Sequence, residues 1–307
     1  MDAIGISERK GIKTSGSLKR EKLIGYSLIF PALLVIIFVM IVPLVFGLVM
    51  SMFQYKMGKE GFSNFIFLDS YIRFFNDGVA LNSVKVTVLF SIGAIVGELA
   101  LGILAAVLLL RINERFGAVL RGIFAMPLLI SPIIIGLIWR YMYDPTYGLI
   151  YYFLGLVKLD ASFGGLGSTS WALFCIIIAD IWQNTPFILL VVTSGLVSIP
   201  GELYESGWID GAGAFKQFYH ITLPLLRKII AVILLIRGGD AFRIFDIIYA
   251  LTEGGPANST QSLSIFAFKE GFGNYDMGYG MAASIITMVI MILFLGPLLN
   301  LTSKENT

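Results

Sequence analysis

Residues 200–224, PGELYESGWIDGAGAFKQFYHITLP, form the longest polar run in the second half of the chain, and long apolar segments border it on both sides. Pro200 suits the first turn of a helix, where its missing N–H has no bond to lose. Three glycines follow at residues 207–213, where a second helix would begin, and Pro224 should end the helix that precedes it. The stretch predicts a helix, a turn and a second helix that lie outside the lipid and face a partner.

The composition around this stretch is that of a membrane protein. Of the 307 residues, 57% are hydrophobic and 14% are charged, whereas soluble domains are about 45–50% apolar and about 25% charged. The net charge of +2 gives no argument for nucleic acid. The single cysteine, Cys175, lies in an apolar run and reads as a small buried hydrophobic residue. One histidine and no Cys/His cluster argue against a metal site.

Six apolar runs are long enough to cross a bilayer core, which needs about 20 residues. They predict an all-α polytopic protein with one transmembrane domain, 23–303, between polar tails at 1–22 and 304–307. Prolines should kink the first run and break the third. The six runs are 24–50, 86–110, 122–143, 171–197, 225–251 and 279–301.

Basic residues are distributed unequally between the two sides of these runs. Thirteen of the 22 lie on the side that holds both termini and residues 200–224, and six lie on the opposite side. The excess of Lys and Arg on the cytoplasmic side of membrane proteins therefore predicts cytoplasmic termini and a cytoplasmic 200–224 loop.

The fifth run carries four charges at i, i+3 spacing, which lets opposite signs meet along one row of a helix. Each charge at mid-membrane costs roughly 2.5–3.5 kcal/mol unless it is paired. The glycine pair 238–239 can also open the helix and free backbone groups towards a polar cavity. The row either attaches this span to its neighbours or forms a wall of a translocation path. It consists of Arg237, Asp240, Arg243 and Asp246.

Residues 180–187, DIWQNTPF, place a carboxylate, an indole and two amides inside the fourth run. Aromatic faces and amides suit a sugar, although Gln and Asn also join helices. Glu98 is interpreted as a packing or subunit contact, and Arg140 as a side chain that reaches the outer interface. The candidate pathway residues are Trp182, Gln183, Asn184, Asp240, Arg243 and Asp246.

The spacing Glu205-Ser-Gly, three residues, Gly211, nine residues and Ile-Thr-Leu-Pro at 221–224 resembles the EAA loop of permease subunits in binding-protein-dependent ABC importers. Ser206 and Gly207 depart from that pattern, which has alanines there, and should weaken the local helix. The resemblance implies a type I importer permease fold whose coupling helix docks into an ATPase subunit. The implied coupling residues are Glu202, Glu205, Asp210, Gly211, Ala212, Phe218, Ile221, Leu223 and Pro224.

DIWQNTPF, DAFRIFD at 240–246 and GGPANST at 254–260 resemble the carbohydrate branch, in particular the first permease of maltose and glycerol-3-phosphate importers. The resemblance implies a bacterial inner-membrane heterodimer with a second permease, two cytoplasmic ATPases and an external binding protein. The implied cargo is a sugar, an oligosaccharide or a related polyol.

No phosphate-binding loop occurs in the sequence, since the only Gly-Lys pair, Gly58-Lys59, is followed by Glu60. We therefore expect no bond chemistry and no cofactor on this chain, with ATP and magnesium held by the partner ATPases. Two alternatives stay open: an amino-acid or peptide permease of the same class, and an ion-coupled transporter that uses the charged row as a relay.

Overall fold

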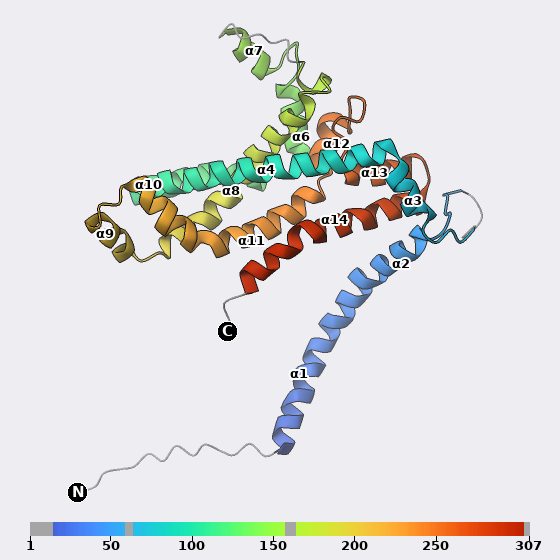
Figure 1. The fold of residues 1–307 in the computed structure, drawn as a ribbon, viewed down its shortest axis with the longest axis horizontal. Helices are drawn as coiled ribbons and strands as arrows, with labels where there is room; N and C mark the ends of the chain where they lie inside the picture. Colours follow the sequence, from blue (N-terminus) through green and yellow to red (C-terminus); the bar gives the residue numbers. More distant parts are fainter. Residues whose placement is uncertain (1–14, 59–63, 157–163, 304–307) are drawn as a thin grey trace. The chain divides into compact units, whose positions relative to one another are not determined.

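The computed structural model describes residues 15–58, 64–156 and 164–303 (Figure 1). Within these ranges the protein is helical, with isolated β-bridges and no β-strand. Residues 1–49 and 50–307 form two compact units. The expected all-α polytopic class is confirmed. Of the expected polar tails, residues 1–14 and 304–307 lie outside the described residues, and residues 15–22 belong to the first helix.

The described part of the first unit belongs to one helix, which a π-turn interrupts and which ends at Ser51, two residues into the second unit. Helix α1 (Ser15–Ile36) leads into η1 (Ile37–Ile41) and α2 (Val42–Ser51). The Val42 N–H bonds to the Ile37 carbonyl, an i→i−5 bond that widens the turn just before Pro43. The helix therefore continues through the proline, and residues 25–51 are long and apolar enough to cross a membrane.

Four long helices form the body of the second unit. Helix α4 packs along α8, and α11 packs against α4, α8 and α14 (Figure 1). Buried side chains such as Ala106, Ile188 and Leu226 fill the space between α4, α8 and α11. All four lie in helical segments long and apolar enough to span a bilayer. Their bounds are α4 Gly78–Leu110, α8 Ala172–Val197, α11 Leu223–Phe242 and α14 Met277–Ser303.

The third predicted span is broken, as its prolines indicate. Helix α5 (Glu114–Ala125) continues as the 3₁₀ turn η2 (Met126–Leu129), and α6 (Pro132–Met142) follows at an angle of 96°. A residue before proline is driven out of the helical region, and Ser131 accordingly has a ψ of 138°. The pair counts as one span or as a re-entrant segment.

Two boundaries in the second half differ from expectation. Pro224 does not end a helix, because α10 (Ala214–Gln217) and the π-turn η4 (Phe218–Thr222) run directly into α11. As before Pro43, the wider turn accommodates the ring, with the Leu223 N–H bonded to the Phe218 carbonyl.

The fifth span ends at Phe242 and not at residue 251. The Arg243 Nε donates to the Gly239 carbonyl at 3.0 Å and so satisfies one of the last carbonyls of α11. A separate short helix, α12 (Asp246–Thr252), follows after this break.

The remaining helices are short and lie in the connecting segments. Helix α12 packs on α6, while α3 and α13 pack on α14. Phe74, Phe266 and Tyr279 meet edge to face in the cluster between α3, α13 and α14. These helices are α3 Asp69–Asn76, α7 Leu149–Leu156, η3 Gly165–Gly167, α9 Gly201–Ile209, α13 Leu263–Phe268 and η5 Lys269–Gly273.

Helix α11 continues through the glycine pair 238–239, so the pair does not open the helix. Gly238 instead allows close packing against α14. A Cβ on Gly238 would lie 2.5 Å from Leu295 of α14, whereas one on Gly239 would meet nothing within 4 Å. We expect Gly238→Leu to lower the free energy of unfolding by about 1–3 kcal/mol through overpacking. Gly239→Leu is the matched control, and Leu295→Ala should partly rescue the first variant. Equal unfolding midpoints for the two glycine variants in detergent would contradict this account.

Candidate functional site

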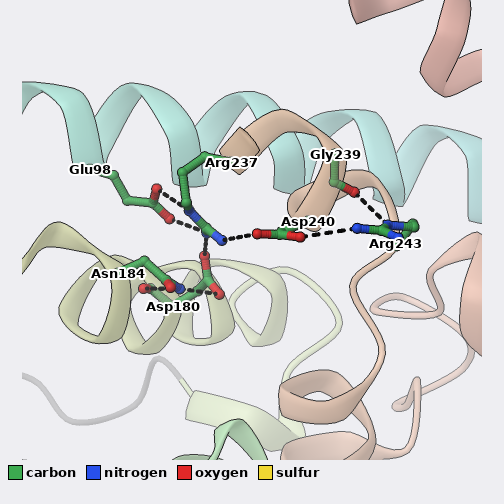
Figure 2. Close-up of polar contacts among 7 residues, drawn as sticks. All are labelled: Glu98, Asp180, Asn184, Arg237, Gly239, Asp240 and Arg243. Atoms are coloured by element: carbon green, nitrogen blue, oxygen red, sulfur yellow. Dashed lines mark hydrogen bonds and ion pairs between the residues drawn. The ribbon is translucent and has the colours of Figure 1, made fainter. Parts of the chain in front are cut away.

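A buried arginine joins three helices at the centre of the second unit. Arg237 of α11 donates from Nε to Glu98 Oε2 at 2.8 Å and from Nη2 to Glu98 Oε1 at 2.6 Å. The same Nη2 donates to Asp180 Oδ2 at 3.1 Å. Glu98 lies on α4 and Asp180 on α8 (Figure 2), and all three side chains are buried. The arginine therefore binds α4, α8 and α11 together through two-pronged, charge-assisted bonds.

The carboxylates around Arg237 have few unused acceptor positions. Asn184, one turn beyond Asp180, donates from Nδ2 to Asp180 Oδ1 at 3.0 Å and to the Asp180 carbonyl at 3.1 Å. Both oxygens of Asp180 are thus hydrogen-bonded. Buried charges persist only when they are paired and hydrogen-bonded in this way.

The charges continue from this buried centre towards an exposed end. Arg237 Nη1 lies 3.9 Å from Asp240 Oδ2, and Arg243 Nη2 donates to Asp240 Oδ1 at 3.1 Å (Figure 2). The side chains of Asp240 and Arg243 are 51% and 66% exposed. The predicted alternation of signs along α11 is therefore present for three members of the row. The fourth, Asp246, belongs to α12.

Next to the network lies a cavity of about 400 Å³. Five of the six candidate pathway residues line it, together with Asp180, Arg237 and Pro132: they are Gln183, Asn184, Asp240, Arg243 and Asp246. Trp182 does not join them. It lies edge to face on Trp139 and lines a separate apolar groove beside α4 and α5. Consecutive residues of a helix point about 100° apart, so Trp182 and Gln183 face different surroundings.

Gln183 links the cavity to the broken span. Its Nε2 donates to the Ile130 carbonyl at 3.2 Å, in the extended segment between η2 and α6. A carbonyl at a helix break has no partner within its own helix and needs one elsewhere in a water-poor interior. Gln183 supplies that partner and holds the α5–α6 bend against α8.

The loop at 200–224 contains the predicted helix and turn. The Gly211 N–H bonds to the Trp208 carbonyl and the Ala212 N–H to the Gly207 carbonyl, at 3.0 and 2.9 Å. Gly211 has a φ of +74°. This bonding pattern with a left-handed residue after the helix end is a Schellman motif, which favours glycine. The glycine of the motif therefore has a local structural role at the end of α9.

A buried glutamine joins the two halves of this loop. Gln217 of α10 donates from Nε2 to the Ala212 carbonyl at 3.1 Å and to the Tyr204 carbonyl at 3.3 Å. The hydroxyls of Tyr204 and Thr222 share a bond of 3.0 Å. These bonds fix α9 against the helix that becomes α11.

The outer surface of the loop is both acidic and apolar. Of the predicted coupling residues, Glu202, Glu205, Asp210, Gly211 and Pro224 are exposed, and Ala212, Phe218, Ile221 and Leu223 are half-buried. Four large apolar side chains, not singled out from the sequence, are exposed beside them. We call this group the loop patch: Trp208, Ile209, Phe215 and Tyr219. Exposed apolar groups gathered in this way are typical of docking surfaces.

The sequence interpretation also missed the partners of Arg237. The interpretation of Glu98 as a packing or subunit contact does not identify Arg237 as its partner, and the candidate pathway residues do not include Asp180. A signal was present, since a lone carboxylate in an apolar run of 25 residues requires a cation from another helix. The neighbouring apolar runs offer few cations, and among the described residues Arg237 is the one that Glu98 meets.

The fold and the site define a multi-pass membrane protein with a polar cavity inside its bundle and a structured polar loop between two spans. Residues 98–301 match the family described as binding-protein-dependent transport system inner membrane component. The chain belongs to this family of ABC importer permeases.

The relatives agree with this assignment. The trehalose/maltose transport system permease protein MalF of Thermococcus litoralis is 38% identical over 92% of this chain and 94% of its own. The sn-glycerol-3-phosphate transport system permease protein UgpA of Agrobacterium fabrum is 32% identical over 79% of this chain and 83% of its own.

A solved structure has the same fold. A chain of a bacterial alginate ABC transporter, crystallised in complex with an alginate pentasaccharide-bound periplasmic protein, superposes with a TM-score of 0.79 at 22% identity. The match covers 94% of this chain and 96% of that chain. The expected importer permease fold is thereby confirmed.

Proposed function

We propose that this chain is a membrane-spanning subunit of an ATP-driven importer for a sugar, an oligosaccharide or a sugar-like polyol. The observation that carries the proposal is the cavity beside Arg237, which presents carboxylate and amide oxygens and amide N–H groups between the helices. Such groups hydrogen-bond hydroxyls. The compounds after which the relatives are named, trehalose/maltose and sn-glycerol-3-phosphate, all carry hydroxyl groups.

The cavity is proposed as part of the translocation path, and the buried network as its structural wall. The charged row 237–246 then has two roles: one part attaches the fifth span to its neighbours, and the other part forms a wall of the path. Arg237 attaches α11 to its neighbours, and Asp240, Arg243 and Asp246 face the cavity.

The 200–224 loop is proposed to dock on a cytoplasmic ATPase through the loop patch and the exposed carboxylates Glu202, Glu205 and Asp210. The charge distribution supports cytoplasmic termini and a cytoplasmic loop. ATP and magnesium then belong to the ATPase partners, and a second, homologous permease completes the path. The alginate transporter chain of the same fold was crystallised with a periplasmic protein, which supports an external binding protein as the delivering partner.

Co-purification from the native membrane tests the proposal. We expect a second permease and two ATPase chains to accompany this chain, with ATP hydrolysis stimulated by one sugar in the presence of the binding protein. Uptake by the single purified chain on an ion gradient, without ATP, would instead support an ion-coupled transporter. Stimulation by a peptide or an amino acid alone would overturn the sugar assignment.

Substitution of Gly211 tests the coupling role. A Cβ there meets nothing within 4 Å, but the φ of +74° strains side chains other than Asn and Asp. We expect Gly211→Asn to retain most uptake and Gly211→Trp to insert normally while ATP hydrolysis no longer drives uptake. Sugar uptake and ATPase rates of the reconstituted complexes measure this directly. Normal uptake with Gly211→Trp would contradict the coupling role.

A further inference from the structure

The charge of the substrate is not decided by relatedness. Trehalose and maltose are neutral, whereas sn-glycerol-3-phosphate is an anion, and the permeases named for them are 38% and 32% identical to this chain. A pathway for an anion needs donors or cations that are free to meet it. The lining of the cavity therefore bears on which kind of sugar passes.

Both cations at the cavity are already engaged. Arg237 is buried and gives Nε and Nη2 to Glu98 and Asp180. Arg243 gives Nη2 to Asp240 and Nε to the Gly239 carbonyl. An anionic substrate that takes Nη2 of either guanidinium displaces a carboxylate, which would then lose this partner.

Carboxylates outnumber the cations in the same place. Three of them, Asp180, Asp240 and Asp246, line the cavity with two guanidinium groups, and Glu98 pairs with Arg237 outside the lining. Asp246 is exposed at the start of α12, and its carboxylate has no hydrogen bond or ion pair with any residue that the structure describes. Its charge acts on whatever enters the cavity.

We infer that this cavity selects uncharged sugars over phosphorylated or otherwise anionic ones, and that Asp246 is a specificity-determining residue that repels anions. The inference rests on the proposed function. The Asp246 carboxylate and Asn184 Oδ1 can accept hydrogen bonds from neutral hydroxyls without any displacement of Arg237 or Arg243. An anion about 6 Å from the Asp246 carboxylate would bind roughly 3- to 100-fold more weakly, over the range of effective dielectric between water and a protein surface.

The test compares each neutral sugar with its phosphate ester, and the charge variants of Asp246 separate the effect of charge from that of the added group. Equilibrium binding is measured by calorimetry on the assembled transporter in nanodiscs, without binding protein or nucleotide. The probes are a panel of neutral sugars that includes trehalose and maltose, each paired with its 6-phosphate. Wild type is compared with Asp246→Asn and Asp246→Arg, and Glu114→Arg on α5 is the matched control because Glu114 does not line the cavity.

We expect wild type to bind the neutral member about tenfold more tightly at low salt. The ratio of the dissociation constants, phosphate ester over neutral sugar, should fall with added salt and with Asp246→Asn. It should fall further, or drop below one, with Asp246→Arg and stay unchanged with Glu114→Arg.

Three results would overturn the inference, each in a different way. Equal or tighter binding of the phosphate esters by wild type would show that the second permease supplies a free cation, and the sugar function would stand. A ratio that Asp246→Asn leaves unchanged would remove the role of Asp246. Binding of no sugar in the panel would overturn the proposed function and the inference together.

Discussion

Replacement of Arg237 by methionine is expected to destabilise the assembled permease by about 3–5 kcal/mol, because two buried carboxylates lose their cation. Glu98 and Asp180 both bond to the same guanidinium nitrogen, so without it two carboxylates remain close together inside the bundle. The unfolding midpoint in detergent and the amount of assembled complex in the membrane measure the loss. Arg243→Met is the matched control, since its side chain is 66% exposed and pairs with a half-exposed Asp240. We expect a change of less than about 1 kcal/mol there.

A variant that removes the three buried charges tests whether unpaired charge causes the loss of stability. In the Arg237→Met background, Glu98→Gln and Asp180→Asn remove the unpaired charges and leave side chains of nearly the same size. We expect most of the lost stability to return, since replacing a buried ion pair by neutral groups is often close to neutral in free energy. A triple variant as unstable as Arg237→Met alone would show that hydrogen-bond geometry, and not unpaired charge, sets the penalty.

The sequence predicted which charged residues of α11 belong to this network better than it predicted their partners on other helices. Periodicity placed Asp240 and Arg243 on one row of α11, and the structure pairs them. The i, i+3 spacing rule, however, applies within one helix. The shortest bonds of Arg237 go to Glu98 of α4 and Asp180 of α8, which are 139 and 57 residues away in the sequence. Pairing between helices depends on their rotation, which apolar runs without amphipathic periodicity leave undefined. For the same reason the sequence did not separate Trp182 from Gln183.

Prolines illustrate the same limit for the fold. Pro132 breaks its span, and Pro43 and Pro224 do not, although each lies in or beside an apolar run. A π-turn precedes Pro43 and Pro224 and rearranges the backbone bonds around the ring, whereas Pro31 and Pro186 lie inside regular α-helices. At Pro132, Ser131 is extended and the Ile130 carbonyl bonds to Gln183 instead. The outcome is decided by tertiary partners that a local rule does not contain.

Phe215→Asp is expected to detach the ATPase from an otherwise intact permease. Phe215 is 82% exposed on α10 and lies with Trp208, Ile209 and Tyr219 in the loop patch. Aromatic residues at the centre of an interface commonly contribute 2 kcal/mol or more, so we expect association at least about 30-fold weaker. A buried unpaired carboxylate would add to the loss. The ATPase retained on affinity-purified permease, measured against its concentration, gives the change.

Tyr147→Asp is the control for this experiment, because it adds the same charge at an exposed aromatic residue. Tyr147 lies between the third and fourth apolar runs, on the side predicted to be opposite to the 200–224 loop. It should leave ATPase retention unchanged. Two further outcomes distinguish docking from coupling. If Phe215→Asp releases the ATPase while Gly211→Trp retains it without driven uptake, the loop patch provides affinity and the Schellman turn transmits movement. If Phe215→Asp retains the ATPase at wild-type affinity, the loop patch is not the docking surface, and the exposed carboxylates Glu202, Glu205 and Asp210 become the remaining contact on this loop.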